Sequence, residues 1–366
     1  MSIENVLDSF KFKGNLEEFE RFGSGHINVT YLAKYNENGK IRLYVVQKIN
    51  TNVFKDIDAL MANIFAVTDY LRDKIKENGG NPHRETLHFI KTADGDTYYR
   101  DENGDCYRAY RYVENSKSCD SCDTAEVFGK SGGAFGKFQK YLSAFPATTL
   151  NETISNFHNT IWRFENEFMP AVEADKLSRA QSCKDEIDFV MSRKADCSRL
   201  TDLIEKGELP IRVTHNDTKL NNVLFDDESD EAICVIDLDT VMPGLALYDF
   251  GDSIRFGANT CAEDEKDTDK IAINLDYFKA YAKGFLSQAG ESFTQAEKDN
   301  LAFSAKLMTL ECGMRFLTDY LNGDVYFRTA YDDHNLVRAK DQLALVADME
   351  RHMDEMEEII RNLVTA

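Results

Sequence analysis

Residues 214–239 limit the possible fold of this chain more than any other stretch. They read THNDTKLNNVLF, then an acidic turn, then AICVIDLD. The apolar runs on both sides of the turn predict two paired β-strands. Asn222 precedes the first strand and Asp237 ends the second, so a hairpin would aim both side chains at one point. Asp217 lies five residues before Asn222.

This spacing suits phosphoryl transfer, which needs a carboxylate near the attacking hydroxyl and metal ligands at the β- and γ-phosphates. The pattern His-x-Asp followed five residues later by Asn supplies such groups, and Asp217 and Asn222 match it. Asp237 is the expected second ligand because it ends a strand. Lys219 could neutralise charge on the γ-phosphate. Asp and Asn beside strands are also common turn residues, and this remains the alternative for each.

A second aspartate motif lies downstream, in the segment Tyr248–Arg255, which reads YDFGDSIR. It contains Asp-Phe-Gly, the tripeptide with which protein kinases hold magnesium. No strand leads into it, since Pro243-Gly244 comes shortly before. We therefore predict that Asp249 and Asp252 brace the catalytic loop through hydrogen bonds to nearby backbone groups, and that Asp237 is the metal ligand.

The beginning of the chain predicts a strand hairpin over residues 21–49, broken by Asn36-Glu-Asn-Gly39. Gly23, Ser24 and Gly25 lie at its mouth, where they could cover phosphates or form an ordinary turn. Lys48 ends the second strand. It could reach the α- and β-phosphates of a nucleotide, or it could be a surface lysine.

Helical spacing of apolar residues over 54–76 predicts one amphipathic helix, and short strands follow it. After about Val113 long helical patterns dominate, apart from a strand-rich patch at 211–241. We predict an α+β, bilobal chain: a nucleotide-binding lobe over residues 1–113 with a small antiparallel sheet and one helix, and a mainly helical catalytic and substrate-binding lobe over 114–366.

Charge and hydropathy exclude several classes of function. The 366-residue chain has a formal net charge of -21, which repels nucleic acid and anionic membranes. Positive charge for an anionic ligand must be concentrated in a pocket. The first residues lack a basic segment followed by an apolar one, and no run is long enough for a membrane span. We therefore expect a cytoplasmic protein that binds neither nucleic acid nor membrane, and we expect a monomer.

These motifs resemble those of the aminoglycoside phosphotransferase and choline kinase superfamily, which shares the protein-kinase-like fold. His215-Asn-Asp217 looks like the HGD or HND loop of that superfamily, and the chain has no Ala-Pro-Glu sequence. The resemblance is closer still to bacterial N-acetylhexosamine 1-kinases. It rests on the following stretches: GSGHIN at 23–28, QKINTNVFK at 47–55, THNDTKLNNV at 214–223, VIDLDTVMPG at 235–244 and MRFLTDYLNGDVYF at 314–327.

The resemblance implies an activity and a set of residue roles. Such enzymes phosphorylate the anomeric hydroxyl of N-acetylglucosamine or N-acetylgalactosamine with ATP and Mg²⁺. Carried over, Asp217 is the catalytic base, Asn222 and Asp237 hold magnesium, and Lys48 contacts the nucleotide. The backbone of Tyr112 and Val113 would meet adenine in a hinge over residues 111–114.

The lysine departs from the pattern in one respect. The helix over 54–76 has no clear Glu to pair with Lys48, and only Asp56 and Asp58 lie in its first turn. The group that orients Lys48 is therefore left open.

A sugar site needs polar groups and an aromatic face. His158, Arg315, Asp319 and Tyr326 offer such groups, and we predict that they bind the sugar together with Asp217. Arg315 and Asp319 stand four residues apart, so they could instead simply pair with one another.

Two other functions stay open at this point. The substrate could be another small alcohol, of the aminoglycoside, choline or homoserine type. Less expected is a nucleotide-binding module without catalysis, because Asp217, Asn222 and Asp237 are all present.

Overall fold

The computed structural model describes residues 3–23, 28–119, 121 and 124–365. They form two compact units, and each unit is discontinuous in sequence. Unit 1 comprises Met1–Ser118, Ala144–Ile154 and Asn222–Pro243, and unit 2 comprises Cys119–Ser143, Ser155–Asn221 and Gly244–Ala366. The sequence predicts two continuous domains, whereas unit 1 also includes residues 144–154 and 222–243. A strand of the 222–243 segment pairs with residues 116–118, which also belong to unit 1.

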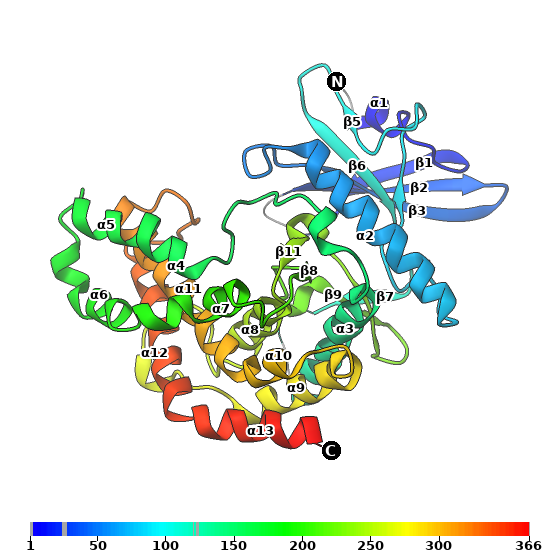
Figure 1. The fold of residues 1–366 in the computed structure, drawn as a ribbon. Helices are drawn as coiled ribbons and strands as arrows, with labels where there is room; N and C mark the ends of the chain where they lie inside the picture. Colours follow the sequence, from blue (N-terminus) through cyan, green and yellow to red (C-terminus); the bar gives the residue numbers. More distant parts are fainter. Residues whose placement is uncertain (1–2, 24–27, 120, 122–123, 366) are drawn as a thin grey trace. The chain divides into compact units, whose positions relative to one another are not determined.

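An antiparallel sheet dominates unit 1 (Figure 1). Its order is β1-β2-β3-β6-β4, and β5 also pairs with β6. The strands are β1 (Asn15–Arg21), β2 (Val29–Glu37), β3 (Lys40–Lys48), β4 (Phe89–Ile90), β5 (Tyr99–Arg100) and β6 (Cys106–Arg111). The β2–β3 turn consists of Asn38 and Gly39, both with positive φ, which suits the twist of a two-residue hairpin. The predicted hairpin is confirmed.

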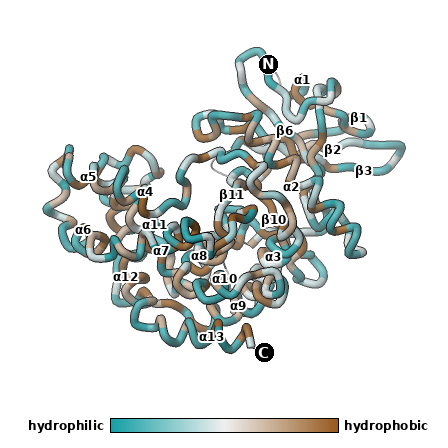
Figure 2. Tube along the Cα trace, in the orientation of Figure 1, coloured by the Kyte–Doolittle hydropathy of each residue, from teal (hydrophilic) through white to brown (hydrophobic). Residues whose placement is uncertain are grey.

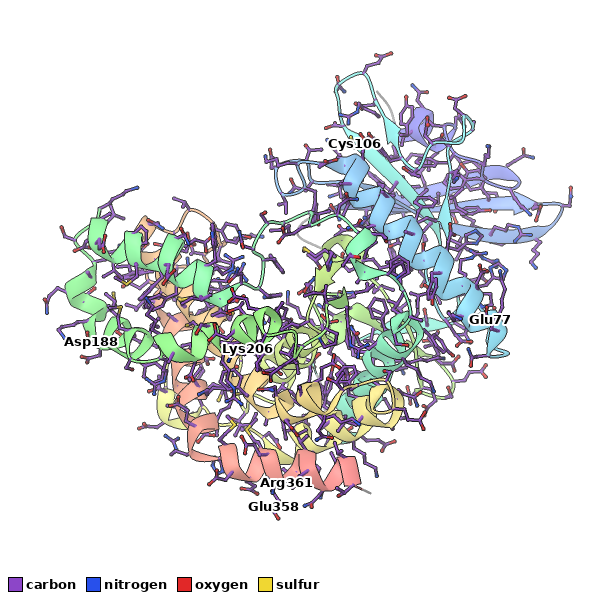
Figure 3. The ribbon with its side chains drawn as sticks, in the orientation of Figure 1. Glu77, Cys106, Asp188, Lys206, Glu358 and Arg361 are labelled. Atoms are coloured by element: carbon purple, nitrogen blue, oxygen red, sulfur yellow. The ribbon has the colours of Figure 1, made fainter. Side chains whose placement is uncertain are left out.

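A different helix packs against each face of this sheet. Tyr44 and Val46 of β3 face a cluster that includes Leu7 of helix α1 (Ile3–Leu7). Because side chains alternate along a strand, the neighbouring positions of β3 and β6 face the other way. That second face packs against helix α2 (Ile57–Glu77), whose Phe65 ring lies 5.8 Å from the ring of Phe89. Figure 3 labels Glu77, where α2 ends, and Cys106, where β6 begins.

A smaller sheet in unit 1 has the order β10-β9-β7. It is formed by β7 (Ser116–Ser118), β9 (Val223–Asp226) and β10 (Ala232–Val235). The β9–β10 pair is the hairpin that the apolar runs of the 214–239 stretch predict, with Val223 opposite Val235. After β10 the chain forms a turn at Leu238–Thr240. Strand β11 (Met242–Gly244) follows, and unit 1 ends within it, at Pro243.

Unit 2 is mainly helical. Its elements are α3 (Ala125–Leu142), α4 (Thr160–Arg163), α5 (Met169–Ala174), α6 (Lys184–Met191), α7 (Lys194–Glu205), β8 (Arg212–Thr214), α8 (Ala246–Gly257), α9 (Leu275–Ala289), α10 (Gln295–Asp299), α11 (Leu301–Asn322), α12 (His334–Arg351) and α13 (Met353–Thr365). Helices α3 and α9 can pack closely because Gly284 has no side chain, since a Cβ there would lie 2.0 Å from the Gly129 carbonyl oxygen. Hydrophobic and hydrophilic residues mix along α13, which buries Met356 and Ile360 (Figure 2).

The fold class follows from these two units. Unit 1 is a small antiparallel-sheet unit with one long helix, and unit 2 is larger and mostly helical. The predicted α+β class is confirmed. Within the described part of the chain, none of the helices is both long and apolar enough to cross a membrane.

Candidate active site

The loop that carries Asp217 is fixed by a buried carboxylate of α8. Asp249 accepts hydrogen bonds from the backbone N–H groups of His215 at 2.9 Å and Asn216 at 2.8 Å. The Gln139 side chain also donates to Asp249, at 2.9 Å. Asn216 has a φ of 64°, a backbone conformation that a non-glycine residue keeps only when its surroundings hold it. Asp249 supplies that hold.

Asp252, one turn further along α8, fixes the other side of the loop. It accepts the backbone N–H of Thr218 at 3.2 Å and forms an ion pair of 2.9 Å with Arg255. Burial raises the pKa of Asp252, but the positive charges of Arg255, Lys219 and His158 outweigh burial and lower it. The prediction that Asp249 and Asp252 brace the loop is confirmed.

Asp217 and Lys219 form an ion pair of 2.8 Å between Oδ1 and Nζ. Burial lowers the pKa of Lys219, but the nearby charge of Asp217 more than compensates, so the pKa is raised. The lysine therefore stays protonated at neutral pH. Unit 2 thus presents a carboxylate and a cation side by side on one braced loop.

The two predicted metal ligands lie at the same end of the β9–β10 hairpin. Asn222 immediately precedes β9, and Asp237 lies two residues after β10. The backbone N–H of Ile236 donates to the Asn222 carbonyl at 2.9 Å, which joins the two strand ends. An amide and a carboxylate oxygen suit Mg²⁺, which completes its shell with water and substrate phosphates. Among the described residues, no group of three or more His, Cys, Asp or Glu side chains could hold a metal ion.

Of the predicted glycine loop, only Gly23 can be described. It has a φ of 76°, and a Cβ added there would meet open space. Ser24 and Gly25 lie outside the described residues, so their predicted role stays a prediction.

Lys48 pairs with Asp105 at 2.5 Å. It lies opposite Tyr107 of β6, so it belongs to the sheet face that packs against α1. The side chain of Arg108 points to the opposite face, where its guanidinium lies 5.8 Å from the centre of the Phe89 ring. The role of Lys48 in nucleotide binding stays a prediction. The partner of the Lys48 amine is the carboxylate of Asp105, which immediately precedes β6.

The aspartates of the first turn of α2 have other partners. Asp56 caps α2 by accepting the N–H of Ala59 at 2.9 Å, and Asp58 accepts the hydroxyl of Tyr98 at 2.9 Å. The group that positions Lys48 is therefore Asp105, and not Asp56 or Asp58.

The predicted hinge is tied to the sheet. The backbone N–H of Tyr112 donates to the Leu43 carbonyl at 3.0 Å, so this group is already used within unit 1. The Val113 carbonyl accepts the hydroxyl of Ser116 at 2.7 Å. The predicted adenine contacts of Tyr112 and Val113 therefore depend on their remaining backbone groups.

His158 forms a buried pair that the sequence analysis did not include. Its Nδ1 lies 2.7 Å from Oε1 of Glu311, and Thr160 donates to Oε2 of the same carboxylate at 2.6 Å. Burial raises the pKa of Glu311, but the charges of His158 and Arg163 hold it below its usual value. The other ring nitrogen of His158, Nε2, is buried and has no hydrogen-bond partner among the described residues. Glu311 therefore fixes the orientation of the His158 ring.

Three aromatic rings surround the predicted substrate residue Arg315. Its guanidinium carbon lies 5.5 Å from the ring centres of Phe157 and Phe327 and 5.9 Å from that of Tyr326. The described residues show no ion pair between Arg315 and Asp319, so the simple pairing of these two side chains is not observed.

Asp319 instead anchors the loop that carries Tyr326. Its carboxylate accepts the backbone N–H groups of Val325, Tyr326 and Phe327 at 2.8–3.0 Å. The Asn335 amide also donates to it, at 2.8 Å. Asp319 is thus a positioning residue for the ring of Tyr326, which is largely exposed.

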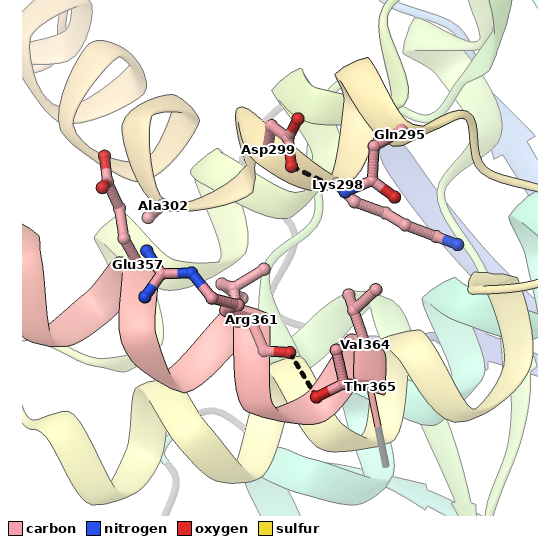
Figure 4. A pocket seen from close by; sticks show the side chains of 9 residues that line it. Gln295, Lys298, Asp299, Ala302, Glu357, Arg361, Val364 and Thr365 are labelled. Carbon is pink, nitrogen blue, oxygen red and sulfur yellow. Dashed lines mark hydrogen bonds between the residues drawn. The ribbon is translucent and has the colours of Figure 1, made fainter.

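A cavity of about 300 Å³ lies elsewhere in unit 2 (Figure 4). Residues of α10, with Lys298 and Asp299, face residues of α13, with Glu357 and Arg361. It contains none of the predicted site residues, so it does not locate the active site.

The sequence marks the positions of two carboxylates that the sequence analysis did not assign, Glu311 and Asp239, but not the partners of these side chains. Glu311 stands four residues before Arg315 on α11, and this spacing places two side chains on one helix face. Asp239 belongs to the same IDLD motif as Asp237. A carboxylate in the interior of a helix gives no sign of its partner, because that partner comes from a distant segment.

Several solved structures have a similar fold. An aminoglycoside phosphotransferase from Alicyclobacillus acidocaldarius is 13% identical with a TM-score of 0.61, covering 100% of this chain and 97% of its own. A choline kinase from Cryptosporidium parvum Iowa II is 13% identical with a TM-score of 0.54, covering 95% and 93%. A spectinomycin phosphotransferase, solved with ADP and spectinomycin, is 13% identical with a TM-score of 0.53, covering 96% and 97%.

The antiparallel-sheet unit, the helical unit and the braced His-Asn-Asp loop define a protein-kinase-like fold of the aminoglycoside phosphotransferase and choline kinase type. The chain belongs to the phosphotransferase enzyme family, whose model matches residues 18–282. The predicted superfamily is therefore confirmed. The closer resemblance to N-acetylhexosamine 1-kinases stays a prediction.

Proposed function

We propose that this phosphotransferase moves the γ-phosphoryl group of ATP to the C1 hydroxyl of an N-acetylhexosamine, such as N-acetylglucosamine or N-acetylgalactosamine. The observation that carries the proposal is the loop in which Asp217 and Lys219 stand 2.8 Å apart and Asp249 holds the backbone. Such a loop offers an acceptor for the hydroxyl proton and a cation for phosphate on one rigid support.

In the proposed reaction, Asp217 orients the C1 hydroxyl and accepts its proton. The sugar oxygen forms a bond to the γ-phosphorus while the bond to the bridging oxygen of ADP breaks. Lys219 stabilises negative charge on the transferred group, since its raised pKa keeps it protonated. The products are a sugar 1-phosphate and ADP.

Asn222 and Asp237 are the proposed magnesium ligands. When bound, the ion neutralises charge on the β- and γ-phosphates. For the nucleotide we propose the glycine loop with Gly23, Ser24 and Gly25, the backbone of Tyr112 and Val113, and Lys48. The position of Lys48 supports its role least, because its amine is paired with Asp105. That ATP is the donor is supported by the ADP bound to the spectinomycin phosphotransferase.

A neutral sugar fits the substrate residues better than a cation does. Choline and aminoglycosides are cations, and aromatic faces attract cations. Here Phe157, Tyr326 and Phe327 already surround Arg315. The carboxylate of Glu311 is engaged by His158 and Thr160. The guanidinium and the free His158 Nε2 suit hydroxyl and carbonyl oxygens, and we propose that Asp319 acts through the loop of Tyr326.

A second candidate is a kinase of an aminoglycoside, choline or another amino alcohol. It is favoured by the likeness in fold to an aminoglycoside phosphotransferase and a choline kinase. ADP release should be measured across a panel of N-acetylhexosamines, other sugars, aminoglycosides and amino alcohols. We expect turnover of the N-acetylhexosamines, and turnover of amino compounds alone would refute the sugar proposal.

The catalytic role of Asp217 is tested by Asp217→Asn. Turnover should fall by about 10³-fold or more, because the proton has no acceptor and the charge beside Lys219 is lost. The affinity for ATP should change little when it is measured by calorimetry. Substantial residual turnover would remove Asp217 from this role. We further propose a monomer in the cytoplasm, which light scattering and cell fractionation can test.

A further inference from the structure

The turn that carries Asp237 is held by more than the hairpin. Asp237 has a φ of 58°, in the left-handed region that non-glycine residues rarely adopt. Such a conformation persists only where surrounding contacts fix it. Two residues later, Asp239 is 4% exposed and contacts two other segments of unit 1.

One contact of Asp239 leads to β6. Its Oδ1 forms an ion pair with Arg108, whose side chain is 3% exposed. Arg108 is itself fixed, because its Nε and Nη2 atoms donate to Oε1 of Gln47 at 3.0 and 2.9 Å. Burial lowers the pKa of Arg108, but Asp239 and, to a smaller extent, Asp237 raise it. The guanidinium thus lies near both aspartates of the IDLD motif.

The other contact leads to the segment after the glycine loop. Asn28 donates to Oδ2 of Asp239 at 2.8 Å. Its own Oδ1 accepts the backbone N–H of Asn50 at 3.0 Å. Asn28 immediately precedes β2, and Asn50 lies just beyond the end of β3. Asp239 therefore joins the turn that carries Asp237 to the start of β2 directly and, through Asn28, to the end of β3.

We propose that Asp239, Arg108 and Asn28 form a positioning network. The network holds Asp237 ready for magnesium, and it couples the turn that carries Asp237 to the nucleotide-binding β2–β3 hairpin. This rests on the proposed function in that Asp237 is taken as a metal ligand. The network occupies both oxygens of Asp239, so Asp239 is not assigned as a ligand. In unit 1 Arg108 is thus the cation that pairs with the IDLD motif, whereas Lys48, on the opposite sheet face, pairs with Asp105.

The test must separate positioning from folding. Removing one partner of a buried ion pair leaves an unpaired charge and risks unfolding, whereas replacing both with apolar residues is often tolerated. The informative variant is therefore the double change Arg108→Met with Asp239→Leu. A matched control is Arg42→Met with Glu37→Leu, because this pair also joins a strand arginine to a nearby carboxylate within unit 1.

The readout is ADP binding by calorimetry with and without Mg²⁺, which needs no acceptor substrate. In the wild-type protein Mg²⁺ should tighten ADP binding. In the double variant this tightening should fall by about tenfold or more, while the Kd for ADP alone stays within about threefold. The control pair should keep the wild-type tightening.

The single change Asn28→Ala gives a second test, because it leaves the ion pair in place. It should weaken the Mg²⁺-dependent tightening and leave metal-free ADP binding unchanged, and it decides the matter if the double variant does not fold. Wild-type tightening in a folded double variant, or in Asn28→Ala when the double variant does not fold, would overturn the network. Failure to phosphorylate any sugar, with these binding results intact, would instead refute only the proposed substrate.

Discussion

At the scale of single residues, one buried carboxylate fixes the shape of the loop that carries Asp217. Asp249 accepts two backbone N–H groups and the Gln139 amide. Asp249→Asn replaces an acceptor oxygen with an NH₂ group that faces these donors. We expect a loss of about 2–3 kcal/mol in stability and at least a tenfold fall in kcat.

Thermal unfolding and steady-state kinetics measure the two effects of Asp249→Asn. Asp217→Asn is the matched comparison, since it should lose turnover without a comparable loss of stability. A variant at Asp249 with wild-type kcat would mean that the loop keeps its shape without this carboxylate.

A second residue-scale prediction concerns Glu311. Glu311→Gln keeps the size of the side chain but weakens its hold on the His158 ring, whose Nδ1 lies 2.7 Å away. The KM for the sugar should rise by about tenfold, because the loss of a charged hydrogen bond disorders the ring. The KM for ATP should stay the same.

A double-mutant cycle with His158→Gln checks this assignment. If Glu311 acts through His158, the two changes together should cost little more than His158→Gln alone. Fully additive effects on the KM for the sugar would show that Glu311 acts independently of His158.

At the scale of elements, helix α12 contains a carboxylate whose charge opposes folding. Asp341 is fully buried, and burial raises its pKa to about 6. Its Oδ1 accepts from Asn259 and Gln342, while Oδ2 has no hydrogen-bond partner among the described residues. The folded state thus binds this proton more tightly than the unfolded state does. Stability should therefore decrease as pH rises from about 4 to 6, and the full penalty should remain above pH 6.

Asp341→Asn removes this ionisation and should stabilise the protein above pH 6 by up to about 3 kcal/mol. At pH 3.5 or below the gain should be small, since Asp341 is then largely protonated in both the folded and the unfolded state. Melting temperatures at the two pH values measure the difference. Asp348→Asn on the same helix is the control, because Asp348 accepts the backbone N–H of Ile273 at 2.7 Å and should show no such gain. An equal change at both pH values would contradict the assignment.

The sequence predicts strands and helices well where each pattern has one local cause. Alternating apolar residues and Asn38-Gly39 predict the β2–β3 hairpin, and the spacing of apolar residues predicts α2. The hairpin after Asn222 and the bracing by Asp249 follow from strand context. Contacts between distant segments are not encoded locally. The Arg108–Asp239 ion pair joins residues 131 positions apart, and the side of the sheet that Lys48 faces depends on a one-residue register.

At the scale of the whole molecule, the charge of -21 sets the field in which a nucleotide approaches. A field of this sign repels ATP, so its association should be slower at low ionic strength. At an ionic strength of 0.1 M, salt screens the repulsion beyond a distance of about 10 Å. The values of kcat/KM for MgATP should therefore rise by about two- to threefold between about 10 mM and 150 mM NaCl.

The acceptor substrate gives this prediction its control. A neutral sugar is unaffected by the field, so its kcat/KM at saturating ATP should stay constant over the same range of salt. A cationic amino alcohol would be attracted by the acidic protein, and its kcat/KM should fall as salt increases. A rate for MgATP that falls with salt would mean that local cations such as Lys219, rather than the net charge, dominate the approach of the nucleotide. The salt dependence of the two substrates thus tests both the nucleotide site and the charge of the acceptor.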